Sequence, residues 1–140
     1  MNWVNLRTRR EGATLPSRGY MDDAGLDLYC LDTRVIWPFC TADLDTGYDV
    51  KVPEGYWGII KSRSSTWKRR RLIVFEGVID PGYTGMLSVC VWNPAPWPKL
   101  VRSGERLAQL LLHRHIYTIP LEVEHMPSTD RGRKGFGSTR

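Results

Sequence analysis

Residues 72–92 have the sequence LIVFEGVIDPGYTGMLSVCVW, in which two apolar runs flank Asp80-Pro81-Gly82-Tyr83. Both runs are rich in the β-branched and aromatic side chains that strands prefer. Proline and then glycine at the centre of a four-residue turn is typical of a type II turn, because Pro81 presets φ and Gly82 accepts a positive φ. The stretch therefore predicts a β-hairpin with Asp80 and Tyr83 at its tip. There Asp80 is either a solvated turn residue or a general base beside an aromatic ring.

The chain on both sides of this stretch has the same strand-like character. Thirteen glycines and nine prolines among 140 residues favour turns and short strands over long helices. One short helix is expected at residues 65–71, and residues 107–121 are expected to form two strands. Further strands are expected at residues 26–31, 35–39, 48–52 and 56–60. The predicted fold class is an all-β barrel or sandwich, closed to remove exposed strand edges.

Composition limits the class of protein. A chain of 140 residues suits one domain, and 41% hydrophobic with 25% charged residues excludes a disordered chain. The net charge of +5 fits ordinary solubility or an anionic ligand. Cys30, Cys40 and Cys90 are too widely spaced for a zinc ribbon or a disulfide framework. Without a secretory segment or an apolar run long enough for a membrane span, we expect a soluble intracellular protein.

Three further segments carry polar groups that suit an anionic ligand. Residues 61–66 (KSRSST) follow a strand and offer hydroxyls with an arginine, which fits a phosphate site or a simple helix cap. Asp22, Asp23 and Asp27 fit either a Mg²⁺ site or a solvated turn. Residues 126–140 are rich in glycine and basic residues, as expected of a frayed tail or of an arm that orders over a ligand. The basic run at 68–71 is interpreted as a solvated face rather than a nucleic-acid contact.

Five short motifs follow one another in a fixed order along almost the whole chain. They are DAGLDL at 23–28, RSS at 63–65, GVIDPGYTG at 77–85, GERLAQL at 104–110 and RGRKGFGST at 131–139. This series resembles the five ordered motifs of trimeric dUTPases. The last motif is the most specific of the five.

The resemblance implies a fold, an assembly and a reaction. The fold would be a jelly-roll-like distorted β-barrel, with residues 1–125 as the domain and 126–140 as a flexible C-terminal arm. Three copies would form a homotrimer in which the arm closes over a neighbouring subunit's active site. The reaction would be Mg²⁺-dependent hydrolysis of dUTP to dUMP and pyrophosphate, which keeps uracil out of DNA and supplies dUMP for dTTP synthesis. Neither nucleic acid nor a membrane would be a partner.

The resemblance also implies a role for each matching residue. Asp80 would activate the attacking water, Tyr83 would lie under the deoxyribose, and Asp27 would help to hold Mg²⁺ through water. The uracil edge would be read by the backbone of Gly77, Val78 and Ile79. Phosphate contacts would come from Arg63, Ser64, Ser65 and Gln109. The arm would contribute Arg131, Phe136, Gly137, Ser138 and Thr139, with Phe136 stacking on the base.

Departures from the family pattern keep other functions open. The Pro81-Gly82 turn also resembles that of dCTP deaminases, and Arg133, Lys134 and Arg140 replace small residues of the arm. The alternatives are therefore a dCTP deaminase, an inactive dUTPase-derived binding protein and a basic nucleic-acid binder. Ammonia release from dCTP, dUTP binding without hydrolysis, or salt-dependent nucleic-acid binding would distinguish them.

Overall fold

A computed structural model describes residues 3–133 and Gly135. In this part of the chain every regular element is a strand except for one five-residue π-helix, which confirms the all-β expectation. The helix η1 spans Thr66–Arg70, close to its expected position. The strands are β1 (Asn5–Thr8), β2 (Leu26–Tyr29), β3 (Arg34–Ile36), β4 (Thr41–Lys51), β5 (Tyr56–Ser62), β6 (Ile73–Val74), β7 (Gly77–Ile79), β8 (Met86–Trp92), β9 (Lys99–Val101) and β10 (Arg106–Arg114).

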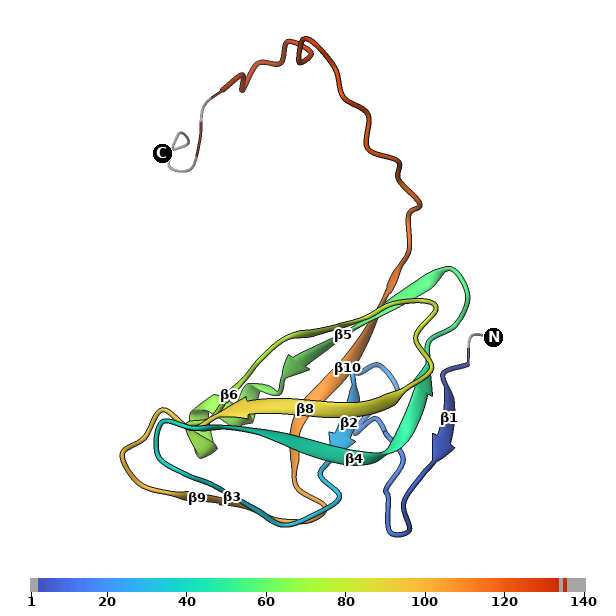
Figure 1. The fold of residues 1–140 in the computed structure, drawn as a ribbon. Coiled ribbons are helices and arrows are strands. Elements are labelled where there is room, and N and C mark those ends of the chain that lie inside the picture. The colour runs from blue at the N-terminus through green and yellow to red at the C-terminus, as the bar shows by residue number, and fades with distance from the viewer. Residues whose placement is uncertain (1–2, 134, 136–140) are drawn as a thin grey trace.

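Two four-stranded antiparallel sheets enclose a common core (Figure 1). Their strand orders are β1-β4-β8-β6 and β2-β10-β5-β7, and β3 pairs with β9 as a small third sheet. Alternate side chains of facing strands enter the interior, as strand geometry requires. The largest fully buried side chains come from both sheets and include Tyr48, Leu44, Leu87, Leu28 and Leu110.

The 72–92 stretch does not form the predicted hairpin. β7 pairs with β5, whereas β8 pairs with β4 and β6, so residues 80–85 cross from one sheet to the other. The turn is closed by the Tyr83 N–H, which donates to the Asp80 carbonyl at 3.0 Å. It is not a type II turn, because Gly82 lacks a positive φ. A six-residue connection is long enough to span the two layers, which a two-residue hairpin loop cannot do.

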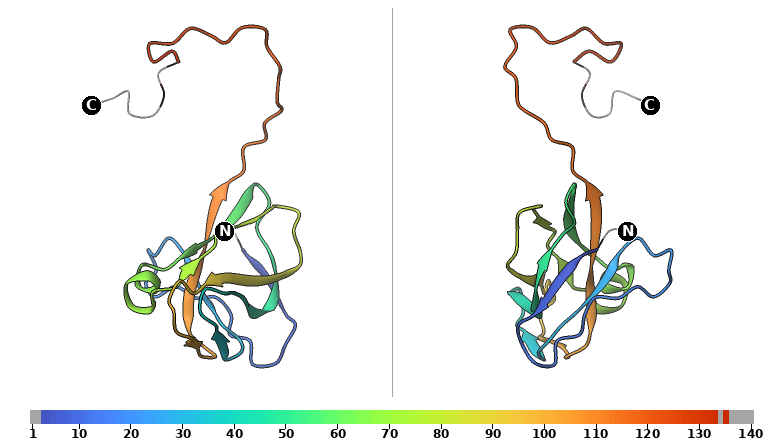
Figure 2. Two further views of the ribbon diagram at one scale, coloured as in Figure 1. Left: turned by 60° about the vertical axis from the view of Figure 1, so that its left-hand side comes forward. Right: turned by 90° about the vertical axis from the view of Figure 1, so that its right-hand side faces the viewer.

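Residues 107–121 contain one strand, β10, which ends at Arg114, rather than the two strands that were predicted. β10 lies at the centre of its sheet between β2 and β5, and Arg114 pairs with Tyr56, where β5 begins. The strand therefore ends where its antiparallel neighbour β5 begins. The chain then runs away from the barrel as an extended segment (Figure 2), along which Ile116, Tyr117, Ile119 and Leu121 are highly exposed.

β1 and β9 were not predicted. Both are short and carry basic side chains, so they have no apolar alternation to mark them. No helix in the described part of the chain has the length and apolar character needed to cross a membrane.

Candidate active site

The loop that joins the two sheets forms the rim of a small pocket. Asp80 and Tyr83 lie on this rim, and β7 supplies Gly77, Val78 and Ile79. The pocket volume is about 210 Å³. Pockets that hold a whole drug-sized ligand measure roughly 300–1,000 Å³, so this one suits a single small ring. The sequence-predicted residues of the third motif are thus brought together here.

The position of β7 explains how this pocket can recognise a polar ring. β7 is an edge strand whose one sheet neighbour is β5, with Ile59 opposite Val78. In an antiparallel pair every second residue directs its N–H and C=O away from the partner strand. The outer edge of β7 therefore presents backbone donors and acceptors at fixed spacing, which is what recognition of a base edge needs.

Asp80 supplies an exposed carboxylate beside the aromatic ring of Tyr83. The carboxylate makes no ion pair or hydrogen bond with any residue that the structure describes. The Tyr83 ring is held in place, because its Oη donates to the Met86 carbonyl at 2.7 Å. A carboxylate beside a ring-sized pocket can act as a general base toward water.

A second cluster gathers around the carboxylate of Asp27 on β2. Nε of Arg63 lies 2.7 Å from Oδ1, and Nη1 of Arg106 lies 3.0 Å from Oδ2. Arg63 also donates to the Arg106 carbonyl at 3.3 Å, and the Arg106 guanidinium lies over the Tyr29 ring. Two guanidinium groups held side by side are a strong binding site for phosphate oxygens. Arg106 was missed in the sequence analysis, although it lies within the fourth motif.

Gln109 joins this cluster from β10. Its Nε2 donates to the Ser62 carbonyl at 3.1 Å, and Asp27 lies opposite it on β2. Gly25 makes room for it, because a Cβ at that position would overlap the Gln109 amide. Ser64 and Ser65 follow β5 in the turn before η1, and the Ser65 hydroxyl does not cap the helix. Both serines thus lie one or two residues from Arg63.

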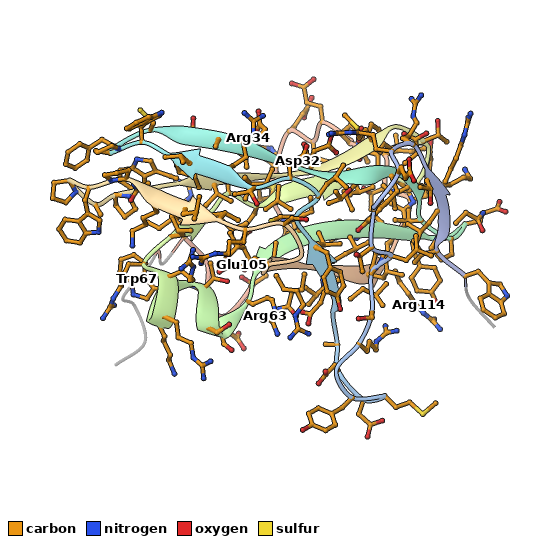
Figure 3. All side chains as sticks on the ribbon, turned by 90° about the horizontal axis from the view of Figure 1, so that it is seen from below. Asp32, Arg34, Arg63, Trp67, Glu105 and Arg114 are labelled. Carbon is orange, nitrogen blue, oxygen red and sulfur yellow. The ribbon has the colours of Figure 1, made fainter. Side chains whose placement is uncertain are left out.

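The two groups lie at opposite ends of β5. Asp80 follows Ile79, which pairs with Gly58 near the start of β5, whereas Arg63 follows its last residue. Five residues of strand at about 3.3 Å each separate these positions by roughly 17 Å. In Figure 3 Arg63 and Arg114, whose partner Tyr56 begins β5, lie apart from each other. Asp80 and Arg63 therefore belong to two separate groups of residues within one chain.

The structure describes only part of the C-terminal motif. Arg131 is exposed in the extended segment, close to a turn in which the Gly132 N–H donates to the Thr129 carbonyl at 3.0 Å. Figure 2 shows the segment that follows β10 standing away from the two sheets that carry both groups. Phe136, Gly137, Ser138 and Thr139 lie outside the described residues.

Metal ligands are sparse. Within residues 3–133 and Gly135, no three His, Cys, Asp or Glu side chains come close enough to hold a metal ion together. Asp22 and Asp23 do not join Asp27, and Asp23 instead accepts a hydrogen bond from the Tyr20 N–H at 2.8 Å. Any Mg²⁺ site would therefore need ligands from substrate and water in addition to Asp27.

Comparison with known proteins gives the family. A family model described as dUTPase matches residues 11–140. A putative deoxyuridine 5′-triphosphate nucleotidohydrolase of Frog virus 3 is 39% identical over 87% of this chain and 74% of its own length. A probable one from Schizosaccharomyces pombe is 34% identical over 92% of each chain. The mouse enzyme is 36% identical over 92% of this chain and 80% of its own.

Solved structures agree with the sequence relatives. The dUTPase of Staphylococcus bacteriophage 80alpha with dUpNHpp has a TM-score of 0.93 at 28% identity, covering 100% of this chain and 99% of that one. A dUTPase mutant from phage phi11 of S. aureus, described with a structural Mg(II) ion, has a TM-score of 0.83 at 27% identity, covering 89% and 98%. The family model decides the choice between dUTPase and dCTP deaminase that Pro81 and Gly82 left open. The chain belongs to the dUTPase family, and its activity is the hydrolysis of dUTP to dUMP and pyrophosphate.

Proposed function

We propose that the protein hydrolyses dUTP as a homotrimer whose active sites combine residues of neighbouring chains. The observation that carries this proposal is the position of Asp80 and Arg63 at opposite ends of β5. A water-activating carboxylate and a phosphate-binding arginine must contact one substrate, and within one chain they are about 17 Å apart. Association of copies supplies the missing half of each site.

The pocket at the 80–85 loop would bind the uracil ring. In the segment Gly77, Val78 and Ile79, the backbone groups that face away from β5 would pair with its polar edge, which rejects bases that leave those groups unpaired. The Tyr83 ring would pack against the deoxyribose. Asp80 would accept a proton from the water that cleaves the anhydride between the α- and β-phosphates, and pyrophosphate would leave.

The cluster around Asp27 would bind the triphosphate. Arg63 and Gln109 would contact phosphate oxygens together with the nearby hydroxyls of Ser64 and Ser65, and Arg106 would add a second guanidinium. Mg²⁺ fits this donor set, because Mg²⁺ commonly takes few protein ligands and completes its shell with waters and substrate phosphates. When bound, it would neutralise part of the triphosphate charge, with Asp27 holding it through water.

Residues 126–140 would act as the arm that closes over a neighbouring subunit, while residues 1–125 form the domain. Tyr117, Ile119 and Leu121, at alternate positions in the segment before the arm, expose their side chains. Such a face is stabilised when another surface covers it, which supports association of copies. Arg131, Phe136, Gly137, Ser138 and Thr139 would then complete the site and exclude water.

Mixing two inactive variants tests the shared site. Asp80→Asn and Arg63→Gln are each expected to be inactive alone. After the two are unfolded and refolded together, about a quarter of the sites should contain both intact residues if chains associate at random. Recovery of pyrophosphate release from dUTP supports the proposal. A mixture as inactive as its parents would show that one chain supplies both residues.

A further inference from the structure

Gly85 lies directly against the ring of Tyr83. A Cβ atom at position 85 would stand 2.6 Å from Tyr83 Oη, 2.8 Å from Cζ and 3.0 Å from Cε2. Non-bonded carbon atoms sit at about 3.5–4.0 Å, so only a residue without a side chain fits here. Backbone conformation does not require this glycine, since its φ is not positive. Glycine is needed at position 85 because the Tyr83 ring approaches its Cα so closely.

Hydrogen bonds fix both partners of this contact. The Gly85 carbonyl accepts from the Val50 N–H at 3.0 Å, which anchors its backbone to β4. Tyr83 is held by its N–H, which donates to the Asp80 carbonyl at 3.0 Å, and by its Oη, which donates to the Met86 carbonyl at 2.7 Å. A methyl group at position 85 would therefore displace the ring, the part of the contact held by a single side-chain hydrogen bond.

We propose that Gly85 is a positioning residue for sugar selection. Because Gly85 has no side chain, the Tyr83 ring can lie directly against it, and this contact sets how far the ring extends into the pocket. The inference rests on the proposed function, in which this ring packs against the deoxyribose. A wall at a fixed depth leaves room for the hydrogens at C2′ and excludes a 2′-hydroxyl. Discrimination by a single small group of this kind contributes about 10- to 200-fold.

The substitution Gly85→Ala tests this role. The kcat/KM for dUTP and for UTP is measured by pyrophosphate release, and the ratio of the two is expected to fall about tenfold. Gly82→Ala is the matched control, because Gly82 lies in the same loop, lacks a positive φ and has nothing within 4 Å of its Cβ position. Its ratio should stay at the wild-type value. A wild-type ratio in Gly85→Ala would overturn the inference.

A double variant separates ring displacement from other effects of the added methyl group. In Tyr83→Ala the ring is absent, so the further change Gly85→Ala should leave the dUTP/UTP ratio unaltered. A further loss in that background would show that Gly85 acts through the backbone, against the inference. Tyr83→Ala itself tests the role proposed for the ring: if its ratio equals that of the wild type, Tyr83 does not select the sugar, and both that role and this inference fail, whereas the shared site is tested separately by the mixing experiment.

A third background covers the case in which Gly85→Ala folds poorly. Tyr83→Phe lacks Oη, the atom closest to the added methyl group. Gly85→Ala should therefore change the ratio less in Tyr83→Phe than in the wild type. Thermal unfolding of each variant identifies those that are folded before their ratios are compared. An equal change in both backgrounds would contradict displacement of the ring.

Discussion

Nε of Arg63 lies 2.7 Å from Oδ1 of Asp27, and this pair joins the end of β5 to β2 across β10. Asp27 is also bound by Arg106, so one carboxylate orients two guanidinium groups. In free water two such groups would repel each other. The buried Asp27, whose side chain is 12% exposed, holds both at a single place before any phosphate arrives.

Replacement of Asp27 by asparagine should weaken phosphate binding. Asp27→Asn keeps the shape of the side chain and removes the charge that holds Arg63 and Arg106. We expect kcat/KM for dUTP to fall by about 10- to 100-fold, the range seen when a supporting carboxylate is lost. The control is Asp32→Asn, because Asp32 pairs with Arg10 at 2.7 Å on the exposed surface. Equal activity of Asp27→Asn and Asp32→Asn would contradict this account.

Asp80→Asn should separate binding from turnover. Loss of the proton acceptor is expected to lower kcat by about 10²- to 10⁴-fold, while the amide leaves the pocket open. Binding is measured with a non-hydrolysable dUTP analogue and turnover by pyrophosphate release. Glu76→Gln serves as the control, since Glu76 is an exposed carboxylate near β7 that pairs with Lys61. Near-normal kcat in Asp80→Asn would remove Asp80 from the role of base.

Asn93→Ala should destabilise the fold. The fully buried Asn93 amide donates to the carbonyls of Ile36 at 3.0 Å and Trp97 at 2.8 Å, and its Oδ1 accepts from the Ala95 N–H at 3.0 Å. Each buried group left without a partner costs about 1–3 kcal/mol. Urea unfolding should therefore show a loss of several kcal/mol. Asn5→Ala, on an exposed position of β1, should cost less than about 0.5 kcal/mol, and an equal loss in both would refute the argument.

Stability should fall at alkaline pH because of Cys30. Burial raises the pKa of this thiol to about 11, from 9.0 in the open chain. The folded state thus holds its proton more tightly, so this contribution is complete below pH 9 and is lost as the pH rises toward 11. The difference corresponds to about 2–3 kcal/mol of unfolding free energy.

Urea unfolding at pH 8 and pH 11 measures this effect. Cys30→Ala should lose less stability between the two pH values than the wild type does. Burial also raises the pKa of Tyr48, which is why the comparison is made between variants rather than on the wild type alone. Cys40→Ala, at an exposed position, should behave like the wild type. Identical pH dependence in Cys30→Ala and Cys40→Ala would show that Cys30 does not contribute.

Local sequence was sufficient to predict most of the strands, with β1 and β9 as exceptions, and insufficient to predict which strands pair. β8 coincides with the predicted run at 86–92, because alternation of apolar residues is a property of one strand. Pairing between strands is not a property of one strand. The sequence therefore led to the prediction that β7 pairs with β8, whereas it pairs with β5. The prediction of a type II turn was wrong for the same reason. The crossing between the two sheets, and not Pro81 and Gly82 alone, determines the backbone conformation there.

In the candidate site, too, residues adjacent in sequence could be predicted together, whereas contacts between distant residues could not. The residues around Asp80 are adjacent in sequence, and the structure brings them to one pocket. Arg106 was missed because its significance depends on contact with Asp27, 79 positions earlier in the chain. The separation of Asp80 from Arg63 also depends on strand register, which no local pattern contains.

The place of β10 between β2 and β5 also governs when the protein can fold. Leu26 on β2 pairs with Leu110 on β10, and so the first strand of this sheet, apart from its bridge to Ser17, has no partner strand until β10 has been made. Contacts between such distant positions slow folding, since a long loop must close before any pairing is gained. During synthesis the apolar residues of β2 and β5 therefore lack their contacts with β10 until that strand has been made. A chain that stops before residue 106 should emerge from the ribosome unfolded and become a substrate for chaperones and proteases.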